Sequence, residues 1–362
     1  MEKRKTSIEL MRFLAVAMVV LIHIRQILYP NNGMAELAFV AVDFFFMVTG
    51  YYTMREVSSE KKSGIAPEAC DTVVYTWNKA KKIFGLYFFA LAMMFVIRTV
   101  EKGSFLFSDT IKELFHFKWE FLMIHMAGFN QAPAFNTDYL LGPSWFISSQ
   151  LLALIPFYFL LKRCRKTFTG AIAPICMAVI YAYIIQNYGT LDVGNQFVFG
   201  TMLGNYRAFA GLSAGAFAAY LGDFYKKLPD LKGGKAFLWI MDVFSWIAAV
   251  SLFVFPKDVI PDPDMVFWLI PFSFILLNGN NDFGPISRWL NYHGSALWAK
   301  LGKLSIYVYL LHFQVIMICK HLIGTDHSIA SSLLILAAAL AFAAVVMTVW
   351  EIIRRRRPQH SK

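Results

Sequence analysis

Two residues that could do chemistry lie inside the first apolar run of the chain, "IELMRFLAVAMVVLIHI" (residues 8–24). Arg12 and His23 are eleven positions apart, which on an α-helix amounts to about three turns and a rise of about 16 Å. Both side chains therefore lie on the same helix face. Glu9 precedes Arg12 by three residues, the spacing at which a carboxylate can pair with a guanidinium and orient it.

Two interpretations of this face stay open from the residues alone. A charged group within a membrane segment normally faces protein or a water-filled cavity. Arg12 would then be a phosphate-binding cation at the cytoplasmic mouth of a cavity, and His23 a proton acceptor deep inside it, since imidazole titrates near neutral pH. In the alternative, Arg12 extends its charge to the membrane interface and His23 makes a structural hydrogen bond to a neighbouring helix.

The composition is that of a membrane protein. Hydrophobic residues make up 58% of the 362 positions and charged residues 16%, well under the roughly 25% typical of soluble domains. Apolar segments recur along the chain, most of them long enough to cross about 30 Å of hydrocarbon. We predict an all-α, polytopic membrane helical bundle with about ten transmembrane helices. The segments are 8–28, 37–54, 83–100, 145–161, 170–186, 197–221, 236–255, 264–278, 301–322 and 329–353.

Lysine and arginine gather in alternate loops, and such loops normally stay in the cytoplasm. We therefore expect both termini to be cytoplasmic. One transmembrane domain would cover residues 1–353, with a long outer loop at 101–144 within it, and a basic cytoplasmic tail would follow at 354–362. The basic clusters are 1–5, 55–82, 162–166, 226–235 and 354–357.

The net charge of +11 is explained by this topology. Basic residues are not interleaved with aromatic residues as on nucleic-acid-binding surfaces, so no nucleic-acid partner is expected. The four cysteines form neither a Cys-x-x-Cys pair nor a metal-ligand spacing, so we predict neither a disulfide nor a metal site.

The outer loop 101–144 is unusually long, and loops of this length are usually functional or disordered. Its many aromatic residues argue against disorder. The piece "SDTIKELF" is typical of a short helix capped by Ser108 or Asp109. A lid that packs on the bundle and a cap that binds an acceptor substrate both fit this loop.

Four further motifs follow the first helix in chain order. Together with Glu9, Arg12 and His23 they resemble the bacterial membrane acyltransferase-3 family, whose first helix carries an acid, then Arg, then ten residues and His. The resemblance extends from residue 8 to residue 312, essentially the whole chain. It rests on "FVAVDFFFMVTGYY" (39–52), "PSWFISSQLL" (143–152), "RAFAGLSAG" (207–215) and "LGKLSIYVYLLH" (301–312).

The chain departs from the family pattern at several positions. Thr49 replaces the serine of the second motif and keeps the hydroxyl. The Arg-x-x-Arg that precedes the third helix is replaced by Lys79 and Lys82, with Gly85 where the family has proline. Lysine attracts phosphate but lacks the two-pronged guanidinium, so this contact is weaker than in the family pattern.

The resemblance implies transfer of an acyl group, usually acetyl, from a cytoplasmic coenzyme A thioester to a hydroxyl, typically on a glycan or a lipid-linked saccharide. Such an enzyme resides in the bacterial inner (plasma) membrane, uses acyl-CoA as its donor substrate and holds no permanently bound cofactor. His23 would be the general base for the acceptor hydroxyl, or would carry the acyl group transiently. The residues expected to bind the polyanionic donor are Arg12, Lys79, Lys82 and Arg207.

The remaining candidate residues each have two interpretations. Asp43 would take part in catalysis by orienting His23, or would form an ion pair with Arg207, for which a purely structural role stays open. Three further residues would bind the saccharide, although aromatic residues at helix ends also anchor in the membrane interface. These substrate-binding candidates are Trp145, Tyr309 and His312.

Two other functions stay open. A proton-coupled transporter or permease of a polar solute would use His23, Asp43 and Arg207 as a proton relay. An assembly factor without chemistry would leave the shared face of Arg12 and His23 unexplained. The sequence does not set the oligomeric state.

Overall fold

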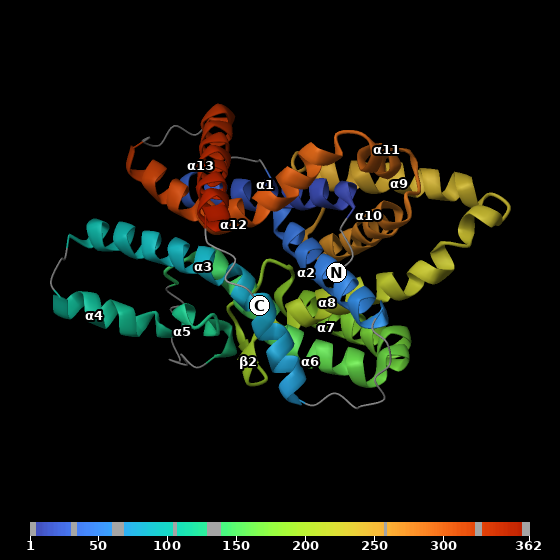
Figure 1. Cartoon of the computed structure of the whole chain (residues 1–362), viewed down its shortest axis with the longest axis horizontal. Coiled ribbons are helices and arrows are strands. Elements are labelled where there is room, and N and C mark those ends of the chain that lie inside the picture. Colours follow the sequence, from blue (N-terminus) through green and yellow to red (C-terminus); the bar gives the residue numbers. More distant parts are fainter. Residues whose placement is uncertain are drawn as a thin grey trace.

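The computed structural model describes residues 5–29, 35–59, 69–103, 107–128, 139–256, 259–322 and 328–356. These residues are almost entirely helical (Figure 1), which confirms the predicted all-α membrane bundle. The α-helices are α1 (Thr6–Leu28), α2 (Ala41–Ser59), α3 (Ala69–Lys102), α4 (Phe107–His116), α5 (Lys118–Phe121), α6 (Trp145–Thr167), α7 (Ala173–Tyr188), α8 (Leu203–Tyr225), α9 (Gly234–Ser251), α10 (Leu269–Asn281), α11 (Pro285–Tyr292), α12 (Ser295–Leu322) and α13 (Ile329–Arg356).

The remaining elements are short. Two strands of two residues each, β1 (Phe197–Val198) and β2 (Thr201–Met202), pair as an antiparallel hairpin. A π-helical turn, η4 (Phe168–Ile172), joins α6 to α7. The 3₁₀ turns are η1 (Ala38–Val40), η2 (His125–Ala127), η3 (Gly142–Ser144), η5 (Leu228–Asp230) and η6 (Asp262–Trp268).

Six stretches of the described chain are long and apolar enough to cross a membrane. One of them, Gly142–Tyr188, contains both α6 and α7. The backbone of Cys164 (φ −142°, ψ 47°) interrupts the helix within the charged run 162–166. The count of about ten crossings and the cytoplasmic side of both termini stay predictions. The other five stretches are Thr6–Leu28, Cys70–Lys102, Gly234–Ser251, Ser295–Leu322 and Ile329–Arg355.

One predicted helix boundary differs from the structure, and the predicted start of the tail falls inside a helix. The short helix expected in the outer loop is present as α4, but it begins at Phe107, so Ser108 and Asp109 lie in its first turn and do not cap it. At the other end of the chain, α13 continues to Arg356. The predicted tail therefore begins inside this helix, and residues 357–362 lie outside the described residues.

Four helices form the centre of the bundle. α1 packs along α12, and α2 packs along α8. Figure 1 shows α2 and α8 near the middle, with α3, α4 and α5 extending to one side and α9, α10 and α11 to the other. Most side chains of α1 and α8 are buried, whereas α13 leaves many apolar side chains exposed, as expected of a helix that faces lipid.

Glycines let α2 and α8 touch backbone to backbone. A Cβ atom at Gly50 would lie 2.0 Å from the carbonyl oxygen of Leu212, and one at Gly215 would lie 2.0 Å from the carbonyl oxygen of Met47. No side chain fits at either position. Close packing through small residues is a general means of helix association in membranes, where apolar burial alone does not favour it.

We expect Gly215→Ala to lower the free energy of unfolding by about 1–3 kcal/mol, because the added methyl group forces α8 away from α2. Gly222→Ala on the same helix is the matched control, since a Cβ there would make an ordinary contact of 3.9 Å with Leu277. Thermal unfolding of the two purified variants in detergent measures the difference. Equal stability of the two would contradict the tight α2–α8 contact.

Candidate active site

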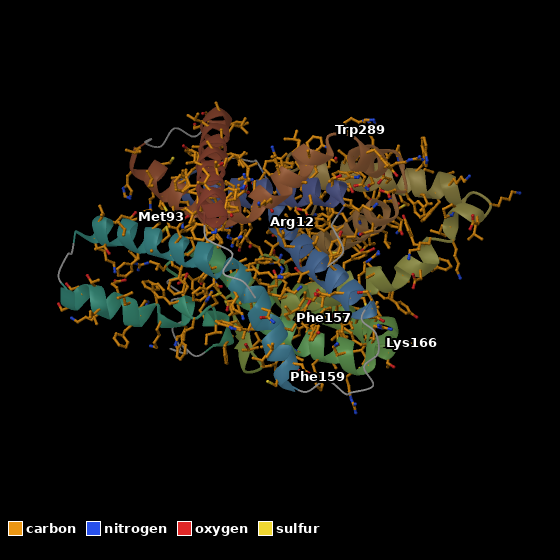
Figure 2. All side chains as sticks on the ribbon, viewed as in Figure 1. Arg12, Met93, Phe157, Phe159, Lys166 and Trp289 are labelled. Carbon is orange, nitrogen blue, oxygen red and sulfur yellow. The ribbon has the colours of Figure 1, made fainter. Side chains whose placement is uncertain are left out.

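A cavity of about 670 Å³ opens between α1, α2, α3, α6 and α12. Arg12 lines it and lies near the middle of the molecule, where α1, α2 and α12 come together (Figure 2). The α2 lining extends from Ser59 inward to Phe45, a rise of about 21 Å along that helix. The cavity is therefore deep, and its volume is in the range of pockets that hold small-molecule ligands.

The mouth of the cavity is positively charged. Four cations and one carboxylate line it, so an anion is attracted to this end. The carboxylate of Glu56 accepts hydrogen bonds from Lys79 (3.0 Å) and from the hydroxyl of Tyr75 (2.9 Å). The four cations are Arg12, Arg55, Lys79 and Lys82.

Arg12 is held in place from its own helix. Its guanidinium donates to Glu9 at 2.6 Å, which confirms the ion pair predicted from the three-residue spacing. Glu9 in turn packs on Gly302 of α12, where an added Cβ would lie 2.0 Å from the Glu9 carboxylate. The close contact of α1 with α12 therefore fixes the acid, and the acid fixes the cation at the cavity wall.

The inner end of the cavity has a polar layer followed by an aromatic layer. The amide nitrogen of Gln150 donates to the hydroxyl of Thr49 at 2.9 Å, and Ser305 also lines the cavity. One helical turn further in, three rings close the cavity. These rings belong to Phe45, Phe146 and Tyr309.

His23 and His312 stack beyond the aromatic layer, with ring centroids 5.3 Å apart and planes at 24°. Nδ1 of His23 lies 3.2 Å from the amide oxygen of Gln26, and Nδ1 of His312 lies 3.0 Å from the carbonyl oxygen of Val308. Because those oxygens only accept, each Nδ1 carries the hydrogen and each Nε2 has a free lone pair.

The two imidazoles differ in their access. His312 is fully buried, and its Nε2 has no hydrogen-bond partner among the residues that the structure describes. His23 is half-buried. A buried acceptor without a partner is costly, so the Nε2 of His312 is suited to accept a hydrogen bond from a bound molecule.

Arg12 and His23 lie in neighbouring compartments. Within the described part of the chain, His23 is not among the residues that line the cavity at Arg12. The ring of Tyr309 lies 6.1 Å from that of His312 and also lines the cavity. The sequence predicts one continuous cavity, whereas in the structure the aromatic layer separates the basic cavity from the histidine pair.

Asp43 and Arg207 form a buried ion pair, with bonds of 2.7 and 3.2 Å. Arg207 also donates to the carbonyl oxygen of Phe39 at 2.9 Å, and the hydroxyl of Tyr181 donates to Asp43 at 2.8 Å. Both side chains of the pair are at most 1% exposed. Of the two roles that the sequence allows Asp43, the ion pair with Arg207 is the one present, and His23 is not among its contacts in the described residues.

Arg207 and Trp145 lie together outside the basic cavity. The guanidinium carbon of Arg207 is 5.9 Å from the ring centroid of Trp145, a distance at which a cation and a ring attract. Among the described residues neither is part of the cavity lining. The structure thus brings Arg12, Lys79 and Lys82 together at the mouth and places Arg207 elsewhere.

Comparison with known protein families gives a match over almost the whole chain. A family model described as an acyltransferase domain, of the acyltransferase-3 family, matches residues 5–350. The chain belongs to this family. It is therefore a membrane acyltransferase, and the resemblance inferred from its motifs is confirmed. The comparisons with curated proteins and with solved structures gave no match.

The acyltransferase contains polar residues that the sequence did not point to. Gln150 completes the polar layer beside Thr49, and its spacing of four residues from Phe146 is the signal that could have found it. Glu120, in the outer loop, had no such signal, because it lies in a short helix without a repeating pattern.

Glu120 joins the outer loop to the start of α6. Its buried carboxylate accepts hydrogen bonds from the backbone N–H groups of Leu140 (2.9 Å) and Leu141 (2.8 Å) and from the hydroxyl of Ser144 (2.7 Å). The hydroxyl of Tyr87, on α3, donates to the carbonyl oxygen of Glu120. Burial outweighs these bonds and raises the pKa of Glu120 to about 7.

This pKa predicts a pH-dependent stability. An unfolded glutamate has a pKa near 4.3, so folding favours the protonated form. The favourable contribution of protonated Glu120 to the free energy of unfolding is complete below about pH 4.3. It is lost as pH rises through about 7. Glu120→Gln removes the titration. We expect its free energy of unfolding, relative to wild type, to rise by about 3 kcal/mol between pH 4 and pH 8.

Thermal unfolding in detergent across this pH range measures the effect. Glu113→Gln, which removes a partly exposed carboxylate of the same outer segment, should follow the wild-type pH dependence. A Glu120→Gln variant that also follows it would show that Glu120 does not titrate in this range.

Proposed function

We propose that this acyltransferase moves an acetyl group from cytoplasmic acetyl-coenzyme A to a hydroxyl of an envelope or exported glycan at the bacterial plasma membrane. The observation that supports it best is the deep cavity with a positively charged mouth, whose inner end adjoins the histidine pair. An anionic donor and a proton acceptor would thereby be brought to the two sides of the aromatic layer.

The donor would bind in the basic cavity. Coenzyme A carries several phosphate charges, and charge-assisted hydrogen bonds from Arg12, Lys79 and Lys82 would hold them at the mouth. The narrow pantetheine arm would extend along α2 toward Thr49. Acetyl-CoA is a substrate here, consumed and released in each turnover, and not a resident cofactor.

The acceptor hydroxyl would approach the half-buried His23 from the other side, and the rings of Phe45, Phe146 and Tyr309 would part so that the acetyl group reaches it. Nε2 of His23 takes the hydroxyl proton, and the hydroxyl oxygen attacks the carbonyl carbon of the thioester. The carbon–sulfur bond then breaks, the coenzyme A thiolate leaves and takes a proton from solvent, and His23 releases the hydroxyl proton to solvent on its own side. In the two-step variant, Nε2 of His23 first displaces the thiolate and holds the acetyl group until the hydroxyl attacks.

His312 and Trp145 would hold the saccharide. The unpartnered Nε2 of His312 can accept a hydrogen bond from the same hydroxyl or from its neighbour on the sugar, and Trp145 offers a ring for stacking. Tyr309 would contact the substrate at the layer between the two compartments. A lipid-linked saccharide could reach this side from the bilayer.

The arrangement is less suited to a proton-coupled transporter. Such a relay needs Asp43 and Arg207 to exchange protons with a pathway. They are instead bonded to each other, Asp43 also accepts a hydrogen bond from Tyr181, and both are fully buried.

We expect His23→Ala to lower the rate of acetyl transfer by about 10²–10⁴-fold, the usual contribution of a general base. Release of coenzyme A thiol by the purified protein, with and without an acceptor saccharide, measures the rate. His116→Ala, at an exposed histidine of α4, should leave it unchanged. A folded His23→Ala protein with the wild-type rate would exclude His23 from the chemistry.

The acceptor is identified in cells. Mass spectrometry of envelope glycans from strains with and without the gene should show one acetyl group lost per modified sugar. The same loss is expected when His23→Ala replaces the wild-type gene. An unchanged glycan profile would exclude an envelope glycan as the acceptor.

Arg12→Gln should weaken donor binding. Hydrogen bonds to charged groups contribute about 1.5–3 kcal/mol, so we expect KM for acetyl-CoA to rise by about 10–150-fold while kcat changes little. Lys226→Gln is the control, because Lys226 is exposed and pairs with Asp223 away from the cavity. A fall in kcat without a change in KM would place Arg12 in the chemical step instead.

A further inference from the structure

The inner end of the cavity repeats one pattern on three helices. On α2, α6 and α12, a polar residue and an aromatic residue are four positions apart, so each pair occupies one helix face one turn apart. On each helix the polar residue is nearer the mouth. The pairs are Thr49 with Phe45, Gln150 with Phe146, and Ser305 with Tyr309.

The three rings of the aromatic layer touch one another. The ring centroids of Phe45 and Phe146 are 5.9 Å apart, those of Phe146 and Tyr309 are 5.4 Å apart, and those of Phe45 and Tyr309 are 6.5 Å apart. These are the separations of packed aromatic pairs. Phe146 and Tyr309 are only 8% and 5% exposed, and Phe45, which lines the cavity, is half-buried.

Neighbouring groups hold the rings in position. The hydroxyl of Tyr309 donates to the carbonyl oxygen of Pro143, in the turn η3 directly before α6. On its other side Phe146 packs on Phe46, with centroids 4.6 Å apart. The layer is therefore braced from both α6 and α2, and a chain that reaches it cannot move the rings without breaking these contacts.

We propose that Phe45, Phe146 and Tyr309 form a floor that sets the length of the acyl chain the enzyme accepts. This inference rests on the proposed function, in which an acyl-CoA occupies the cavity. The thioester carbonyl is polar and belongs beside Thr49 and Gln150. One helical turn of about 5.4 Å then separates the carbonyl from the floor, which leaves room for an acetyl group and not for an extended chain of about eight carbons.

The test measures binding, so it does not depend on turnover. Ketone analogues of acyl-CoA, with a methylene between sulfur and carbonyl, are titrated into the purified full-length protein by calorimetry. Wild type should bind the octanoyl analogue at least about tenfold more weakly than the acetyl analogue, since each misplaced methylene in a closed pocket costs about this much. Phe146→Ala, and separately Phe45→Ala, should reduce that ratio by about tenfold or more.

Phe44→Ala is the matched control. Phe44 is adjacent to Phe45 on α2 and fully buried, and it packs on Phe272 with centroids 5.2 Å apart. In the described chain it does not line the cavity. The control should therefore keep the wild-type ratio even if its stability falls, and two separate floor variants are used so that one can fail to fold without loss of the test.

The outcomes separate this inference from the proposed function. If wild type binds both analogues equally, or if neither floor variant changes the ratio while coenzyme A still binds, the floor assignment is wrong and the donor site stands. If coenzyme A itself does not bind, the proposed function is wrong, and the floor assignment that rests on it is wrong as well. A changed ratio in the floor variants and not in Phe44→Ala supports the assignment.

Discussion

The contact between Glu9 and Gly302 determines the geometry of the whole site. A glycine is required on α12, because any side chain would overlap the Glu9 carboxylate. This contact keeps α1 and α12 at close range, and both helices then continue in the same direction toward the stacked pair of His23 and His312. The same carboxylate holds Arg12 at the cavity wall. One close helix contact thus positions the cation at one end and the imidazoles at the other.

The aromatic layer is the second constraint, and it has a physical rationale. A polyanionic donor needs a wet, positively charged cavity, whereas a membrane enzyme must not connect two aqueous compartments. Three packed rings seal the gap between them, and the histidine pair lies directly beyond the seal. A reaction between groups that arrive from opposite sides then requires this one layer of side chains to open locally.

The sequence predicted what depends on local spacing. The Glu9–Arg12 pair and the basic mouth at Lys79 and Lys82 follow from residues close together in the chain, and the structure contains both. The meeting of His23 with His312 could not be predicted, because the packing of α1 on α12 sets it and no local pattern reports that packing. The role of Glu120 could not be predicted for the same reason, since the fold of the outer loop brings its hydrogen-bond partners to it.

Hydropathy alone is likewise a limited guide to the two central helices. α2 and α8 occupy the positions of predicted apolar segments, yet neither belongs to the six stretches that are apolar enough to span. They carry Asp43, Arg207 and the glycines of their contact. Helices at the centre of a bundle face protein on all sides, so they can hold polar groups and small residues that a lipid-facing helix such as α13 does not need.

The buried pair of Asp43 and Arg207 connects this central packing to the site. Charge buried at this depth is costly unless both partners are present, and loss of one partner typically costs about 3–5 kcal/mol. The pair is fully buried and bridges α2 to α8. Asp43 lies two residues from Phe45, so the bond that locks α2 against α8 also fixes the part of α2 that supplies a ring to the aromatic layer. The ion pair therefore supports the active site by positioning, although it lies outside the cavity.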